Sequence, residues 1–265
     1  MGKTIGIVSL KGGVGKTSVV AALGATLANF NKKVLLVDGD LSTPSLGVHL
    51  DIINPEFTLH DVLLGSANLR DAIHAFENFD VIPSSIFNKN KINPFKLRDK
   101  IKSVKKSYDV ILIDSSPSMR EDTLAVLLAS DEVFVVTTPD YPTLAMTLKA
   151  VDLAKRRGTP ISGLILNKVY NKNFELSLDD IEKTSDVPVM AVLPYDIDVI
   201  KALSDFTPST IYKPKSEGSE ECKKLAAAIL GEKYKPIKMR KFFRFVSPKK
   251  QELNRTAFYD RVFKE

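Results

Sequence analysis

The sequence has little of what metal-binding or disulfide-stabilised proteins require. Its 265 residues include one cysteine, Cys222, which excludes a disulfide within the chain and a Cys-x-x-Cys metal motif. The three histidines, His49, His60 and His74, have no metal-ligand spacing, so a structural zinc site is not expected. No apolar run approaches the ~18 residues that a membrane-spanning helix needs, and we expect no signal peptide. These absences favour a cytoplasmic protein.

Positive charge is concentrated at the C-terminal end of the chain. From residue 235 onward there are ten basic and three acidic residues, whereas residues 1–234 have a net charge of −1. The overall charge of +6 and the pI of about 9.1 therefore come from this end. We expect one α/β domain over residues 1–231 and a basic amphipathic tail over residues 232–265. The asymmetry predicts an anionic partner for the tail.

A glycine-rich segment near the N-terminus, Ser-Leu-Lys-Gly-Gly-Val-Gly-Lys-Thr-Ser, is the most informative stretch of the sequence. It follows an apolar, β-branched run typical of a buried strand and precedes a helical run, which is the context of a phosphate-binding loop. Backbone N–H groups of such a loop, together with the helix N-terminus, bind anions. The residues predicted to bind the nucleotide here are Gly12, Gly13, Val14, Gly15, Lys16, Thr17 and Ser18. Lys16 would contact the terminal phosphates and Thr17 would bind Mg²⁺.

Apolar strands alternate with helices along the rest of the domain. Strands are expected at 4–8, 33–40, 79–83, 109–114, 132–137, 161–167 and 187–193. Helices are expected at 19–28, 58–65, 69–76, 95–106, 122–128, 143–157, 178–184, 199–203 and 217–230. Continuous apolar strands separated by helices predict a doubly wound α/β fold, with a mostly parallel sheet covered on both faces.

Three aspartates follow these buried strands. Asp38 and Asp40 end the second expected strand, and Asp114 ends the fourth. Ligands of such sheets bind beyond the carboxyl ends of the strands, so the fold should bring these carboxylates to the glycine loop. A divalent cation between phosphates and carboxylates needs this arrangement.

The spelling Lys-Gly-Gly-x-Gly-Lys-Thr, with Lys11 at its head, resembles the deviant phosphate loop of the MinD/ParA family of ATPases. The resemblance implies a P-loop fold, an ATPase activity with ATP and Mg²⁺ as cofactors, and a homodimer that forms with ATP. It implies that Asp38 and Asp114 support the metal and that Asp40 positions the attacking water. Lys11 would cross the dimer interface to the partner's nucleotide, and a separate, unidentified protein would activate hydrolysis.

The segment Asn167-Lys168-Val169-Tyr170 bears on the choice of base. It begins like the Asn-Lys-x-Asp sequence of GTPases, but Tyr170 stands where an aspartate would pair with guanine. In the MinD/ParA pattern an asparagine at this strand end and a loop proline flank adenine, here Asn167 and Pro194. ATP is therefore favoured over GTP.

The tail has helical periodicity, because Met239, Phe242, Phe243 and Val246 recur at i, i+3, i+4 and i+7. Surrounding basic residues make this a predicted interfacial helix that binds an anionic membrane, similar to the targeting tail of MinD. Packing on the protein's own surface or on a dimer partner is an alternative, and nucleic acid is another. The chain continues for about nineteen residues after Val246, beyond where bacterial MinD tails stop.

Two functions follow from these patterns. The first is a MinD-like switch, cytoplasmic but bound peripherally to the membrane in its ATP state, that serves cell division or a related positioning process. The second is a ParA-like ATPase that binds DNA through basic residues. An iron–sulfur carrier of the same superfamily would need ligating cysteines that Cys222 alone cannot supply.

Overall fold

The computed structural model describes residues 2–88, 90–232 and 249–263. Within this part of the chain, eight strands form one sheet in the order β3-β4-β2-β5-β1-β6-β7-β8. The strands are β1 (Lys3–Val8), β2 (Val34–Asp38), β3 (His74–Phe76), β4 (Phe79–Ile82), β5 (Val110–Asp114), β6 (Glu132–Thr137), β7 (Ile161–Val169) and β8 (Val189–Pro194). Neighbouring strands run parallel except β3, which pairs antiparallel with β4. The predicted mostly parallel α/β fold is confirmed.

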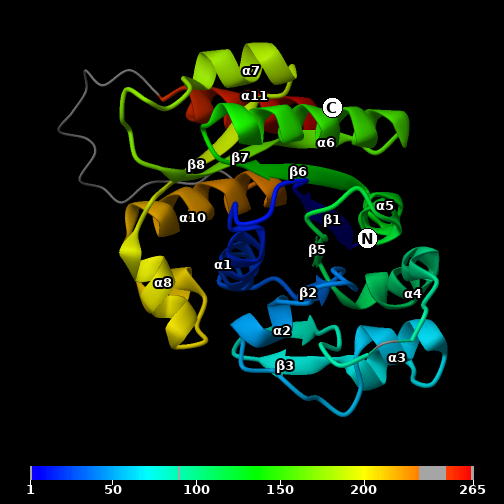
Figure 1. Cartoon of the computed structure of the whole chain (residues 1–265). Coiled ribbons are helices and arrows are strands. Elements are labelled where there is room, and N and C mark those ends of the chain that lie inside the picture. Colours follow the sequence, from blue (N-terminus) through cyan, green and yellow to red (C-terminus); the bar gives the residue numbers. More distant parts are fainter. Residues whose placement is uncertain (1, 89, 233–248, 264–265) are drawn as a thin grey trace.

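Helices cover both faces of the sheet (Figure 1). They are α1 (Lys16–Ala28), α2 (Leu46–His49), α3 (Leu59–Leu64), α4 (Leu97–Val104), α5 (Glu121–Ala129), α6 (Tyr141–Arg156), α7 (Leu178–Ser185), α8 (Ile197–Ser204), α9 (Ser209–Tyr212), α10 (Glu217–Leu230) and α11 (Lys250–Phe263). Short 3-10 helices span Leu69–Ala72, Pro94–Lys96 and Lys105–Ser107.

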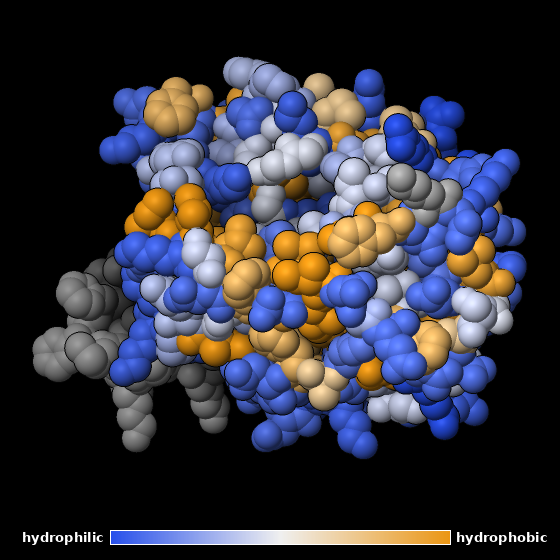
Figure 2. Space-filling view, turned by 60° about the horizontal axis from the view of Figure 1, so that its bottom comes forward, coloured by the Kyte–Doolittle hydropathy of each residue, from blue (hydrophilic) through white to orange (hydrophobic). Residues whose placement is uncertain are grey.

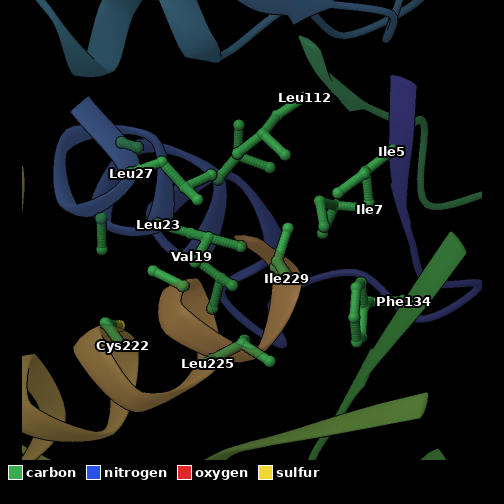
Figure 3. Packing of buried hydrophobic residues seen from close by; sticks show 14 of the residues in the cluster. Ile5, Ile7, Val19, Leu23, Leu27, Leu112, Phe134, Cys222, Leu225 and Ile229 are labelled. Carbon is green, nitrogen blue, oxygen red and sulfur yellow. The ribbon is translucent and has the colours of Figure 1, made fainter. Parts of the chain in front are cut away.

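Two hydrophobic cores separate the sheet from its helical layers. Alternate residues of a strand face opposite sides, so Leu36 of β2 joins the core under α1 and α10, whereas Leu35 joins the core under α3 to α7. In the first core, Leu23 of α1, Leu225 of α10 and Ile7 of β1 belong to one cluster of buried side chains (Figure 3). Burial on both faces explains why the strands read as continuous apolar runs.

The helix predicted over residues 69–76 is wrong. Asn68 and Asp71 form a capping box that supports one 3-10 turn, Leu69–Ala72. The chain then extends as β3 and reverses through Glu77, whose φ is 49°. The rings of Phe76 and Phe79, 5.2 Å apart, close this hairpin at the sheet edge.

Helix α11 lies in the segment that the sequence assigned to the tail, and it packs against the domain. Its Phe258 is 4 % exposed and belongs to the first core. Nη1 of Arg255 donates to the carbonyl oxygen of Met190 (2.7 Å) and to a carboxylate oxygen of Glu221 (2.9 Å). Of the alternatives for the tail, packing on the protein's own surface describes residues 250–263. The apolar stripe Met239, Phe242, Phe243 and Val246 lies outside the described residues.

One face of the molecule is formed by α2, β3 and α3, the elements at the bottom of Figure 1. On this face, apolar patches interrupt a largely hydrophilic surface (Figure 2). Val48 of α2 and Leu64 of α3 are 39 % and 38 % exposed. Within the described residues no helix is both long and apolar enough to cross a membrane.

Candidate active site

The phosphate-binding loop connects β1 to α1 and depends on glycine. Gly13 and Gly15 have φ values of 79° and 85°, in the left-handed region that favours glycine. A Cβ at Gly15 would lie 2.4 Å from Nδ2 of Asn167. Asn167 Nδ2 donates to the carbonyl oxygen of Val14 (2.8 Å), and Nζ of Lys168 donates to that of Gly13 (2.7 Å). The end of β7 therefore fixes the loop from outside.

The first turn of α1 is bound to the end of β5. Nζ of Lys16 donates to Oδ1 of Asp114 at 2.5 Å, and the hydroxyl of Thr17 donates to Oδ2 at 2.6 Å. The Thr17 hydroxyl is also 3.0 Å from that of Ser45. Asp114 is fully buried because β5 lies at the centre of the sheet, beside β1. A cation, hydroxyl groups and a carboxylate thus meet at one point, as a Mg²⁺–phosphate site requires.

Asp38 is a second buried carboxylate at this edge. Burial raises the pKa of Asp38 well above its ordinary value, and the neighbouring carboxylates of Asp114 and Asp40 raise it further. Backbone N–H groups of Ser45 and Leu46, at 3.1 and 3.0 Å, donate to Oδ2 of Asp38. Three carboxylates here face one buried lysine, so the cluster carries unbalanced negative charge that a divalent cation would neutralise.

Asp40 is held in a single orientation by its own loop. Its Oδ1 accepts the N–H groups of Ser42 (3.2 Å) and Thr43 (2.9 Å), and its Oδ2 accepts the Thr43 hydroxyl (2.9 Å). Asp40 is 4 % exposed yet lines the hollow above the phosphate loop. This orientation suits a carboxylate that must bind one water molecule.

Two adjoining hollows bring the predicted nucleotide residues together. A hollow of about 280 Å³ is lined by Lys11, Gly12, Gly13, Val14, Gly15, Lys16, Thr17, Ser18 and Asp40. A smaller one, of about 50 Å³, shares Ser18 and is lined by Asn167 and Pro194. Asp38 and Asp114 complete the group through the contacts described above. The fold thus gathers all the residues predicted to bind nucleotide and metal at one edge of the sheet.

Several residues of this site carried no predicted role. The Ser45 hydroxyl, next to that of Thr17, lies directly before α2, and no motif of the sequence assigned it a role. Lys168 appears in the sequence pattern only as the second residue of Asn167-Lys168, with no predicted contact to the loop. The smaller hollow is also walled by Asp198 and Cys222, which the sequence places far from the loop. Burial raises the pKa of the Cys222 thiol to about 12, so this cysteine stays protonated.

Lys11 differs from Lys16 although both belong to the same loop. Lys16 is 7 % exposed, whereas Lys11 is an exposed residue at the open face of the domain. Lys11 also lines a third hollow, of about 470 Å³, together with Asp140, Tyr170 and Phe174. Lys11 therefore lies at the exposed boundary between two hollows.

The residues present fit a nucleoside triphosphate with Mg²⁺. The glycine loop forms a cradle that a Cβ at Gly15 would disrupt, and the carboxylate cluster has one buried lysine, Lys16, for three carboxylates. Thr17 and Ser45 supply hydroxyl oxygens next to those carboxylates. This fold and this site define a P-loop nucleoside triphosphatase.

Comparison with known proteins places the chain more narrowly. A family model described as "AAA domain" matches residues 2–157. An uncharacterised ATP-binding protein of Methanocaldococcus jannaschii is 34 % identical over 250 residues, covering 93 % of this chain and 95 % of the relative. The sporulation initiation inhibitor protein Soj of Bacillus subtilis is 32 % identical over 250 residues, covering 86 % and 98 %.

A solved structure of the septum site-determining protein MinD of Pyrococcus horikoshii, complexed with Mg-ADP, matches with a TM-score of 0.82 and 37 % identity. The match covers 86 % of this chain and 96 % of that one. The chain belongs to the MinD/ParA family of P-loop ATPases. It is an ATPase with ATP and Mg²⁺ as cofactors, as its phosphate loop predicted.

Proposed function

We propose that the protein is a nucleotide-driven dimerisation switch of the MinD type. In this cycle ATP joins two copies, their tails hold an anionic membrane, and hydrolysis releases them. The observation that carries the proposal is the contrast between Lys16, buried on Asp114, and Lys11, exposed at the mouth of the same loop. A lysine in the second position can act on a nucleotide bound by another copy.

Each residue of the site has a role in this proposal. Bound Mg-ATP supplies the phosphoryl group and the cation that neutralises its charge. Lys16 binds the terminal phosphates, Thr17 contacts the metal, and the buried Asp38 and Asp114 hold the metal's shell. Asp40 orients the water. Lys11 stabilises the charge of the phosphoryl group bound by the partner copy, so hydrolysis requires the dimer.

The dimer is tested with Lys11→Ala and Asp40→Ala. Lys11→Ala should bind nucleotide normally and lose hydrolysis, while exposed Lys172→Ala serves as a matched control with normal hydrolysis. Asp40→Ala should form a long-lived ATP dimer, measured by light scattering. An Asp40→Ala protein that remains monomeric with ATP would contradict the proposal.

The residues around the smaller hollow and Tyr170 support binding of ATP rather than GTP. Tyr170 stacks on Tyr195, with ring centroids 4.7 Å apart, and lines the third hollow. It offers no carboxylate to guanine. Two aspartates wall the smaller hollow, and both already have partners. Asp198 pairs with Lys201 (2.8 Å) and Lys213, and Asp196 accepts the N–H of Asp198 (2.9 Å) and lies 3.6 Å from Lys213. A competition titration should show tighter binding of Mg-ATP than of Mg-GTP, and equal affinities would contradict this step.

The sequence of the tail supports an anionic membrane as its target. Two tails joined by the ATP dimer bind jointly, so one weak amphipathic segment suffices per copy. A ParA-like role on DNA is the second candidate, favoured by the similarity to Soj and by the basic residues of the tail. The phenylalanines of the tail favour the membrane, because phosphate contacts do not need them.

Sedimentation separates the two candidates. The protein is mixed with anionic liposomes or duplex DNA, each with ATP or ADP, and we expect ATP-dependent pelleting with liposomes. Phe242→Glu with Phe243→Glu should abolish it without changing nucleotide affinity, and Phe95→Glu, at a 42 % exposed site of the domain, should not. Pelleting with DNA alone, reversed by 200 mM salt, would establish the ParA-like role instead.

A further inference from the structure

His60 lies buried between two loops at the carboxylate edge of the sheet. Its side chain is on the first turn of α3, and the residue is 1 % exposed. The backbone N–H of Ser85 donates to Nδ1 of His60 at 3.1 Å, and Nε2 of His60 lies 3.2 Å from the carbonyl oxygen of Leu41. Leu41 directly follows Asp40.

These two partners determine the state of the ring. A backbone N–H can only donate, so Nδ1 must accept, and a carbonyl oxygen can only accept, so Nε2 must carry the proton. The ring is therefore the neutral Nε2–H tautomer. Burial, which lowers the pKa of His60, favours the same state, although the bond to Leu41 and the nearby Asp61 act in the opposite direction.

The same region fixes the backbone on both sides of Asp40. The hydroxyl of Ser84 donates to the carbonyl oxygen of Asp38 at 2.7 Å. His60 donates to the carbonyl oxygen of Leu41, and the N–H of Leu59 donates to that of Pro83 (2.8 Å), which joins α3 to the loop after β4. The backbone around Asp40 is thus tied to two elements that themselves are bonded together.

We infer that His60 is a positioning residue for hydrolysis: by holding the carbonyl of Leu41, it fixes the loop that presents Asp40 to the phosphate hollow. The inference rests on the proposed role of Asp40. It adds to that role a residue with no contact to nucleotide, which acts through one hydrogen bond. Buried neighbours of His60 on α3, such as Leu59 and Val62, are apolar, so a packing role alone would be served by leucine.

Two amide variants of His60 test its two hydrogen bonds separately, because each can keep only one of them. Glutamine can place an N–H near the position of Nε2 and keep the bond to Leu41, whereas asparagine can place an oxygen near Nδ1 and keep only the bond to Ser85. Steady-state ATP hydrolysis by the full-length protein should fall about tenfold in kcat for His60→Asn and His60→Leu, with KM unchanged. His60→Gln should retain kcat within about twofold of the original.

His74 offers a matched control. Its Nε2 also lies 3.2 Å from a carbonyl oxygen, that of Phe57, but at the sheet edge away from Asp40. His74→Leu should leave kcat unchanged. Equal kcat for His60→Leu and the original protein, or equal losses for His60→Gln and His60→Asn, would overturn the inference.

A second measurement does not depend on activity. In the nucleotide-free protein, the N–H groups of Ser42 and Thr43 should exchange with deuterium faster in His60→Asn than in His60→Gln, while Ser85 should show the reverse. The ¹⁵N spectrum of the His60 ring should show protonation at Nε2. Unchanged exchange in all variants, or a ring protonated at Nδ1, would contradict the inferred role of His60.

The proposed role of Asp40 fails separately. If Asp40→Ala hydrolyses ATP normally, that role is wrong whatever the His60 variants do. If Asp40→Ala loses hydrolysis and His60→Leu does not, only the inference about His60 is wrong. When both are right, adding His60→Leu to Asp40→Ala should cause no further loss, because both act in one step.

Discussion

Two clusters of buried charge lie on different sides of this molecule, and they are built differently. At the nucleotide edge, Asp38, Asp40 and Asp114 face Lys16, so negative charge is in excess. Between α10 and α11, Arg255 and Glu221 form a pair at 2.9 Å. Glu221 gains a second partner in Lys224, and Arg255 also donates to a backbone carbonyl.

The difference separates a site that needs a ligand from a contact that only holds the fold. Burying charge is unfavourable unless it is paired and hydrogen-bonded. The α10–α11 pair is bonded within the chain through Nη1 of Arg255, while Nη2 is buried without a hydrogen-bond partner among the described residues. The carboxylates at the nucleotide edge do not meet the pairing condition, and the raised pKa of Asp38 reflects the unfavourable burial of its charge. Mg²⁺ and Lys16 together would offset the three carboxylates, and the N–H groups of the loop and the N-terminus of α1 would bind the phosphates.

The largest effect should come from removing the one cation of the unbalanced cluster. Lys16→Met keeps the length of the side chain and loses the charge. We expect Mg-ATP affinity to fall about a thousandfold, roughly 4 kcal/mol, because a buried hydrogen-bonded charge is lost. Isothermal titration calorimetry measures this, with Lys172→Met as control. Affinity within tenfold of the original would show that Lys16 serves only Asp114.

Breaking the balanced pair should destabilise the fold without affecting the nucleotide. Arg255→Met leaves Glu221 buried with fewer partners, and we expect about 3 kcal/mol lower free energy of unfolding in urea. Nucleotide affinity per folded molecule should not change.

The double variant Arg255→Met with Glu221→Met is the control for this measurement. It removes both charges and should recover most of the loss. A double variant as unstable as Arg255→Met would mean that the lost bond to the carbonyl of Met190, rather than the unpaired carboxylate, sets the effect.

Asp38→Asn should act in the opposite direction on the other cluster. It removes a buried negative charge while its amide oxygen can still accept the N–H groups of Ser45 and Leu46. The nucleotide-free protein should gain about 1–2 kcal/mol in stability, and Mg²⁺-dependent ATP binding should weaken. Calorimetric Tm values with and without Mg-ATP test both parts. A lower Tm without nucleotide would show that Asp38 is stabilising as an ion.

Of the two clusters of buried charge, the one at the nucleotide edge could largely be predicted from the sequence, and the one between α10 and α11 could not. The glycine loop and the three aspartates follow strands of a parallel sheet, whose carboxyl ends lie at one edge, so Asp38, Asp40 and Asp114 were expected near the loop. Contacts such as Lys168 with Gly13 or His60 with Leu41 depend on loop paths that no periodicity encodes.

The C-terminal region shows the limit more clearly. Its apolar spacing predicts an amphipathic helix around Met239, Phe242, Phe243 and Val246, which lie outside the described residues. For α11, which follows them, composition does not say which surface covers the helix. Burial of Phe258 and the pairing of Arg255 with Glu221 required the position of α10. The short β3 was missed because three residues give no period, and the turn at Glu77 has no glycine to mark it.

The smallest predicted effect is a pH dependence that has opposite signs at two groups of the nucleotide edge. The pKa of Asp38 is raised in the folded state, so its contribution to stability falls as pH rises above the ordinary value near ~4. The pKa of His60 is lowered by burial, so its contribution is present above about pH 6.5 and is lost as pH falls, because the unfolded chain then binds the proton more readily.

Substitutions separate the pH-dependent contributions of Asp38 and His60 to stability. Between pH 7.5 and 5.5, the free energy of unfolding should fall by about 1 kcal/mol more in the original protein than in His60→Gln, which keeps a neutral side chain at every pH. Asp38→Asn should instead remove the part of the stability that decreases with rising pH. Urea unfolding at both pH values measures these differences. Identical pH profiles for His60→Gln and the original would show that the ring is not held neutral by its two partners. The inferred positioning role of His60 would then be unsupported, whereas the excess of negative charge around Asp38 would not be affected.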